Sequence, residues 1–168
     1  MAFPVLYDAC VLFPAPLRDL LIRLGQAGLV RARWTEQILD EVFHNIRLRR
    51  PELNDASLQR TRALMNAAVR DSLVTGYEPL IDGLTLPDKD DRHVLAAAVR
   101  SGAQVIVTAN LRDFPDDALS AFGIEAQSPD EFVLNLLDLA PGAVAAIVSK
   151  QAADLKNPPR RATSFSRR

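Results

Sequence analysis

Short apolar runs alternate along the chain with longer segments in which apolar side chains recur every three or four positions. The runs FPVLY (3–7) and VIVT (105–108) have the length of β-strands, and the second is rich in β-branched residues. In PLRDLLIRLGQA (16–27) the leucines share one face, which predicts a helix that ends at Gly28. This alternation is typical of a parallel sheet wrapped by helices, so we predict an α/β fold.

The other predicted helices begin at residues that favour helix N-termini. We expect them to start at Thr35, at Asn54 or Asp55, near Asp90, and at Ser128 in the sequence SPDE. The helix that starts near Asp90 is expected to end at Gly102, and two helices complete the fold. The segment LVRARW (29–34) is expected to be a short apolar link.

Length and composition fit one globular domain. The chain has 168 residues, of which 48% are hydrophobic and 24% are charged, and this length can bury a core without disulfides. No apolar run approaches the roughly 18 residues of a membrane span. The N-terminal sequence MAFPVLYDAC lacks the basic region of a secretory signal. We therefore expect a cytoplasmic protein that does not enter a membrane.

Cysteine and histidine are too rare for the usual zinc sites. The chain has one cysteine, Cys10, and two histidines, His44 and His93. These three residues cannot supply the four nitrogen and sulfur ligands of a typical structural zinc site. Any bound metal ion is therefore expected to have oxygen ligands.

Charge is distributed unevenly along the chain. All 21 acidic residues precede residue 156, whereas the last 13 residues, KNPPRRATSFSRR, carry five basic side chains and no acidic one. We therefore predict a folded domain over residues 1–155 and a basic, disordered tail over residues 156–168. Such a tail could attract nucleic acid or an acidic partner, or it could be a solvated end without a function.

Polar side chains follow both predicted strands. Asp8 comes directly after the first strand, and Thr108, Asn110 and Asp113 follow the VIVT strand. Because ligands bind at the carboxyl ends of the strands in an open parallel sheet, we expect these residues to share one edge of the fold. Taken singly, each aspartate could equally be a turn former.

Two further carboxylates could join this group from predicted helices. Glu41 lies near the border of an apolar stripe, and Asp91 lies in the first turn of the next helix, where the helix dipole favours an acid. Asp88 and Asp90 precede it, and Asp88 suits a helix cap. Like charges brought close together repel unless a cation neutralises them, and hard oxygen ligands favour Mg²⁺ or Mn²⁺.

Four blocks of sequence carry a resemblance to a known family. YDACVL (7–12), TEQILDEV (35–42), DKDDRHVLAAAV (88–99) and VIVTANLRDF (105–114) resemble, in order and spacing, the signature of PIN-domain nucleases, especially the VapC-like toxins of bacterial toxin–antitoxin pairs. The resemblance covers roughly residues 3 to 137. It implies a three-layer α/β/α PIN-like fold with a central, mostly parallel sheet.

The resemblance also implies roles for individual residues. By matching blocks, Asp8, Glu41, Asp91 and Asp113 would be the metal and catalytic carboxylates, and Thr108, Asn110, Asp88 and Asp90 would be supporting groups. Among the three neighbouring aspartates, the spacing to Gly102 and Thr108 favours Asp91 as the ligand. Similar proteins commonly have Asn or Ser in place of Cys10, and many have Asp in place of Asn110.

The activity that the resemblance implies is metal-dependent hydrolysis of RNA. A carboxylate-held Mg²⁺ or Mn²⁺ activates water, so no histidine base is needed, and the products would bear 5′-phosphate and 3′-hydroxyl ends. An antitoxin would cover the acidic cleft, and the toxin would form a homodimer. Both histidines are expected to be structural or surface residues, while Arg47, Arg49 and Arg50 are weaker candidates for binding RNA phosphates. Trp34 and Tyr77 are expected to be packing residues.

Two other classes of function stay open from the residues. A non-catalytic PIN-like module would bind RNA or protein without cleavage, and Asn110 favours it by removing one acidic side chain. A phosphatase of the haloacid-dehalogenase type also has an aspartate after its first strand, but it needs a second aspartate two residues later, where this chain has Cys10.

Overall fold

The computed structural model describes residues 2–156 and contains a four-stranded, fully parallel sheet. The strands are β1 (Phe3–Tyr7), β2 (Val30–Arg33), β3 (Val105–Val107) and β4 (Glu125–Gln127), in the order β2–β1–β3–β4. The predicted α/β fold with a parallel sheet is therefore confirmed. The predicted basic tail consists of residues that, apart from Lys156, lie outside the described part of the chain.

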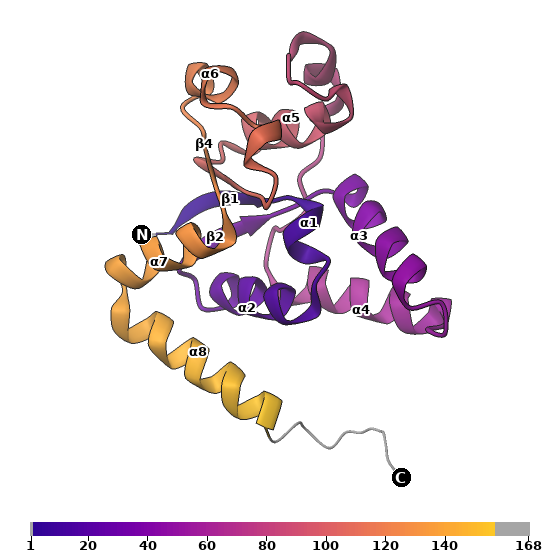
Figure 1. The fold of residues 1–168 in the computed structure, drawn as a ribbon, viewed down its shortest axis with the longest axis vertical. Coiled ribbons are helices and arrows are strands. Elements are labelled where there is room, and N and C mark those ends of the chain that lie inside the picture. Colours follow the sequence, from indigo (N-terminus) through magenta and orange to yellow (C-terminus); the bar gives the residue numbers. More distant parts are fainter. Residues whose placement is uncertain (1, 157–168) are drawn as a thin grey trace.

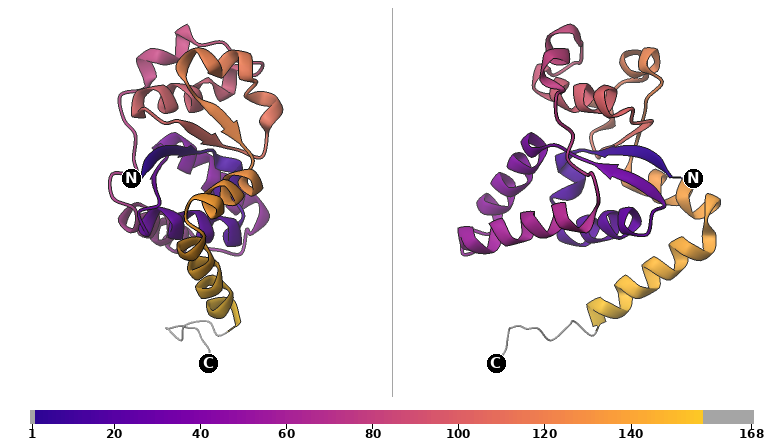
Figure 2. Two further views of the ribbon diagram at one scale, coloured as in Figure 1. Left: turned by 90° about the vertical axis from the view of Figure 1, so that its left-hand side faces the viewer. Right: turned by 180° about the vertical axis from the view of Figure 1, so that it is seen from behind.

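Helices cover both faces of the sheet, which gives three layers (Figures 1 and 2). On one face lie α2 (Ala15–Gln26) and α7 (Pro129–Leu139), and on the other lies α5 (Arg92–Ser101). Tyr7 faces the first layer, where its hydroxyl donates to the Leu21 carbonyl and its ring meets Phe132 edge-on. Because both faces are covered, β3 and all of β1 except Phe3 are buried, as expected for central parallel strands.

The two edge strands were not predicted. The expected link at 29–34 contains β2, in which Val30 and Ala32 are buried while Arg31 is exposed. This alternation is that of an edge strand with one covered face, and the two charged positions obscured it. β4 has three residues, and only Gln127 is buried. Its backbone pairing with β3, rather than an apolar pattern, defines it.

The helices α3 (Glu36–Arg49) and α4 (Asp55–Ala68) form a hairpin that projects beyond the sheet (Figure 1). Thr35 caps α3 as predicted, because its Oγ1 accepts from the Ile38 amide at 2.9 Å. Asn54 caps α4 in the same way, which decides between the two predicted starts. The guanidinium of Arg62 ties the two helices together through Glu36 and Asp40.

Short helical turns connect the remaining elements. They are α1 (Ala9–Leu12), η1 (Glu78–Gly83), η2 (Lys89–Asp91), η3 (Leu111–Asp113), α6 (Asp116–Leu119) and η4 (Ser120–Phe122). The α-helix predicted from about Asp90 begins at Arg92, because residues 89–91 form the 3-10 turn η2. It ends at Gly102 as predicted, with φ of 70°.

The chain ends, as far as it is described, in the long helix α8 (Pro141–Lys156), which packs on α2. Arg23 donates to Asp154 at 2.8 Å, and the Gln151 amide donates to the Pro16 carbonyl at 2.8 Å. Among residues 2–156, no helix has the length and apolar character needed to cross a bilayer.

Candidate active site

Asp8 lies at the carboxyl end of β1, directly before α1. Its amide donates to the Val107 carbonyl at 3.1 Å, which ties it to the end of β3. One carboxylate oxygen, Oδ1, accepts from the Ala9 amide at 2.8 Å, so the side chain also caps α1. Only 7% of Asp8 is exposed. A charged group this well buried needs partners, and these bonds hold its carboxylate in one orientation.

Thr108 and Cys10 orient the second oxygen of Asp8. The Thr108 hydroxyl donates to Oδ2 at 2.9 Å, and the Cys10 thiol lies 3.5 Å from the same oxygen. Cys10 therefore contacts Asp8 in the position where similar proteins commonly have Asn or Ser. Burial, and then the charge of Asp8, raises the pKa of the Cys10 thiol to about 11, so the thiol stays protonated at neutral pH.

Asp91 is the last residue of η2 and directly precedes α5. Its side chain makes no capping hydrogen bond to α5. Its pKa is raised from 3.8 to about 6, first by burial and then by the charges of four other carboxylates: Asp8, Asp88, Asp113 and Glu41. These charges act on Asp91 only because the chain brings all five groups to one region. The five carboxyl groups, which come from separate segments, therefore lie close enough for the other four to act on Asp91.

Glu41 and Asp113 approach Asp91 from two other segments. Glu41 is an exposed residue of α3, and its pKa is raised by partial burial and then by the charge of Asp8. Asp113 ends the 3-10 turn η3, where its amide donates to the Asn110 carbonyl at 2.9 Å. Glu41 precedes Asp91 in the sequence and Asp113 follows it. The two acids therefore reach Asp91 from different segments, one from α3 and the other from the loop after β3.

The supporting residues have mainly local roles. Asp88 caps η2, because its Oδ1 accepts from the Asp90 amide at 2.9 Å, in agreement with the predicted cap. Asp90 is exposed. The Asn110 amide donates to the Thr108 hydroxyl at 3.0 Å, so the backbone of Asn110 supports the group that orients Asp8.

The donor set suits a hard divalent cation, although the acids do not surround a common point as they stand. Among residues 2–156, no three His, Cys, Asp or Glu side chains are arranged to hold one metal ion. Each ionised acid raises the free energy of its neighbours, and a bound cation would offset this cost. Asp8, Glu41, Asp91 and Asp113 offer only carboxylate oxygens, the ligands that Mg²⁺ and Mn²⁺ prefer.

His93 lies closer to the acids than its sequence spacing from Asp91 indicated. It is 8% exposed, its Nδ1 is buried without a hydrogen-bond partner among the described residues, and burial lowers its pKa. The charges of Asp8 and Asp90 act in the opposite direction. Because His93 follows Asp91 by only two positions, its sequence position did not indicate that it would lie near the acids. His44, in contrast, is exposed on α3.

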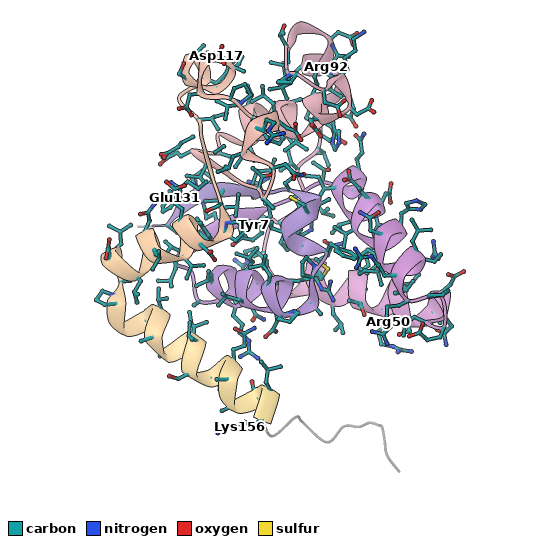
Figure 3. All side chains as sticks on the ribbon, in the orientation of Figure 1. Tyr7, Arg50, Arg92, Asp117, Glu131 and Lys156 are labelled. Carbon is teal, nitrogen blue, oxygen red and sulfur yellow. The ribbon has the colours of Figure 1, made fainter. Side chains whose placement is uncertain are left out.

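The three arginines proposed as weak phosphate ligands lie at the far end of α3 from Glu41. Arg47 pairs with Asp55 and Arg50 pairs with Glu52, while the Arg49 guanidinium lies 5.5 Å from the centre of the Phe13 ring. Arg50 marks the tip of the α3–α4 hairpin in Figure 3. Six to nine helical residues separate these arginines from Glu41, which corresponds to roughly 9–14 Å.

The two aromatic residues expected to pack do so. Trp34 is fully buried, and its Nε1 donates to the Asn66 side chain at 2.8 Å. Tyr77 is 5% exposed, and its hydroxyl donates to the Gln37 side chain. Neither presents a ring for stacking on RNA.

Comparison with known proteins gives two family matches. Residues 4–112 match a model described as "PIN domain", and residues 129–167 match one described as "VapC50 C-terminal domain". A curated protein of Mycobacterium tuberculosis (strain ATCC 25618 / H37Rv), described as "Putative ribonuclease VapC50", is 53% identical over 73 residues. That alignment covers 44% of this chain and 43% of the relative, so it spans less than half of either protein. No solved structure matches the chain.

Proposed function

The chain belongs to the PIN-domain family, and from this we propose that it is a divalent-metal-dependent ribonuclease, the toxin of a type II toxin–antitoxin pair. The observation that carries the proposal is the action of Asp8, Glu41 and Asp113 on the pKa of Asp91. Four acids from four segments near one another are costly in a small domain unless they bind a cation. The relative described as "Putative ribonuclease VapC50", which aligns with part of this chain, supports the same function.

In this proposal Asp8, Glu41, Asp91 and Asp113 are the metal ligands and catalytic carboxylates. A divalent cation, Mg²⁺ or Mn²⁺, would supply activation of water and neutralisation of charge at the phosphodiester. Asp8 is oriented by the Ala9 amide and the Thr108 hydroxyl, so it binds without having to reorganise. Asp91 is mostly ionised above its pKa of about 6, so its carboxylate is available to a cation at neutral pH.

The partners follow from the charge and surface of the site. RNA is the proposed substrate, and hydrolysis would leave 5′-phosphate and 3′-hydroxyl ends. An antitoxin with a basic side chain is complementary to the acids, and we propose that it covers them in the cytoplasm. Leu134 and Leu139 on α7 are 60% and 74% exposed, which supports a homodimer that buries them.

The test is Mg²⁺-dependent cleavage of a panel of single-stranded and structured RNAs. We expect the wild-type chain to cut at least one RNA, EDTA to stop it, and Asp8→Asn to slow it by about a hundredfold or more. Asp138→Asn is the matched control, because this exposed acid on α7 lies outside the acid group. Equal rates for the two variants would contradict the proposed site.

Two other outcomes separate the rival functions. Binding of Mg²⁺ and RNA without cleavage would indicate a non-catalytic PIN-like module. Hydrolysis of small phosphate esters through an aspartyl-phosphate on Asp8 would indicate a phosphatase of the haloacid-dehalogenase type. Mass spectrometry of the trapped protein detects that intermediate directly.

A further inference from the structure

A hollow of about 340 Å³ lies along the outer edge of β2. Apolar residues and two glycines form part of its wall, and charged residues form the rest. The apolar part includes Ala2, Val30 and Val69, with Gly25 and Gly28, and the charged part consists of Arg31, Arg33, Arg70 and Asp71. None of the four carboxylates proposed as metal ligands is among the residues that line it.

The arginines of this hollow form no ion pair, a property that they share with Arg60 but not with four other arginines of the described residues. Arg23, Arg47, Arg50 and Arg62 each form an ion pair with a carboxylate. No ion pair involves Arg31, Arg33 or Arg70 within the described residues 2–156. Asp71, the one acid that lines the hollow, raises the pKa of Arg33 without forming an ion pair with it. The hollow therefore has three guanidinium groups and one carboxylate.

Arg33 is the most constrained of the three arginines. Its Nε is buried and has no hydrogen-bond acceptor among the described residues. Burial lowers its pKa, and the positive charge of Arg31 lowers it further. A buried donor without an acceptor costs free energy that a bound anion would recover.

The backbone holds these residues in place. Arg31 and Arg33 are two positions apart on β2, so their side chains leave the same face of the sheet. The Trp34 amide donates to the Ser72 carbonyl at 2.8 Å, which fixes Arg70 and Asp71 close beside the end of β2. Asp71 has a φ of 57°, and a left-handed conformation at a residue other than glycine is a feature that clusters at binding sites.

We propose that this hollow binds a nucleotide, with its phosphoryl group on Arg33, Arg31 and Arg70. Guanidinium groups recognise phosphate oxygens through paired hydrogen bonds. Ala2, Gly25 and Gly28 are not buried, so this part of the wall is accessible to a base or sugar, and the Asp71 carboxylate can accept from a hydroxyl or amino group. The volume is at the lower end of the range for small-ligand sites, which suits a single nucleotide.

The site does not depend on the proposed ribonuclease activity and is tested without metal. AMP, adenosine and inorganic phosphate are titrated into the full chain in EDTA, and binding is followed by calorimetry. We expect AMP to bind more tightly than either fragment, and Arg33→Gln to weaken AMP by about tenfold or more. Arg33→Lys should retain part of the affinity, because it keeps the charge and loses the paired geometry.

Controls separate the hollow from the acid group and from general charge. Arg60→Gln removes an exposed positive charge of α4 outside the hollow and should leave AMP binding unchanged, as should Asp8→Asn. Circular dichroism checks that each variant is folded. Equal weakening by Arg33→Gln and Arg60→Gln would overturn the site, and phosphate binding as tightly as AMP would overturn the nucleotide assignment.

A second comparison identifies the source of the nucleotide. A short RNA with a 5′-phosphate and the same RNA with a 5′-hydroxyl are titrated under the same conditions. A preference for the phosphorylated RNA that Arg33→Gln abolishes assigns the hollow to an RNA end. If Arg33→Gln weakens the binding of AMP but not of either RNA, the hollow is assigned to a free mononucleotide.

Discussion

Asp91 is the residue on which the charges of the acid group act most strongly. Its pKa of about 6 exceeds the ordinary value of 3.8, so the folded chain binds this proton more tightly than the unfolded chain. Ionisation of Asp91 therefore costs stability, and this loss grows as the pH rises from about 4 through about 6. The fold accepts this destabilisation at neutral pH in the absence of a cation.

Replacing Asp91 with Asn should stabilise the metal-free chain at neutral pH. We expect a gain on the order of 1 kcal/mol in the free energy of unfolding, after allowing for solvent screening of this partly exposed group. The gain should shrink as the pH falls through about 6 and vanish below the ordinary carboxyl pKa. Denaturant unfolding in EDTA across this pH range measures it.

Magnesium provides the complementary measurement on the same variant. Mg²⁺ should stabilise the wild-type chain more than Asp91→Asn, since binding to the folded state adds to its stability. Asp138→Asn serves as the control for the loss of one exposed acid. If the difference in the free energy of unfolding between the wild type and Asp91→Asn, measured in EDTA, does not change with pH, the assigned titration of Asp91 is refuted.

The sequence indicated the acids near the ends of the strands and the supporting Thr108, but not the burial of His93 or the thiol contact of Cys10 with Asp8. Asp8 and Asp113 follow strands, and this position alone indicates a shared edge of the sheet. The contact of Cys10 with Asp8 depends on the path of α1, and the burial of His93 depends on the turn η2 before α5. Both are consequences of tertiary packing that no local pattern encodes.

At the scale of elements, strands with few apolar residues were the ones that sequence analysis missed. β1 and β3 are buried on both faces and are therefore continuous apolar runs. β2 and β4 are edge strands, and their hydrogen bonds to β1 and β3 define them more than their side chains do. The helices were easier to predict, because the caps Thr35, Asn54 and Ser128 depend on local chemistry.

The attachment of α8 can be tested with two valines of the same helix. Val144 is 1% exposed, whereas Val148 is 44% exposed. We expect Val144→Ala to lower the free energy of unfolding by about 1–2 kcal/mol, because it leaves a cavity beside α7 and α2. Val148→Ala should change it by less than about 0.5 kcal/mol. Denaturant unfolding gives both values, and equal effects would contradict the described packing of α8.

At the scale of the whole molecule, the two segments with separate family matches share one core. The C-terminal match includes α7, whose Phe132 packs against Tyr7 of β1 with 6.1 Å between ring centres. This shared packing supports our proposal that residues 1–155 form a single domain.

The uneven charge of the whole chain predicts a salt effect on RNA binding. Residues 157–168 include four arginines and no acid, and the rest of the chain has an excess of acids. Removing these twelve residues should weaken RNA binding and reduce its dependence on salt, because fewer counterions are released. Fluorescence anisotropy with Asp8→Asn at several salt concentrations measures this without cleavage. An unchanged salt slope would show that the tail does not contact RNA.

The bond from Thr108 to Asp8 joins residues 100 positions apart, and Asp113 comes later still. During synthesis, β1 leaves the ribosome before β3 and has no β3 beside it until about 5–20 seconds later, at usual elongation rates. For that interval Asp8 has neither its orienting hydroxyl nor most of the neighbouring acids. The acid group is therefore incomplete during this interval, and whatever chemistry the acids perform begins only after β3 and η3 have been synthesised.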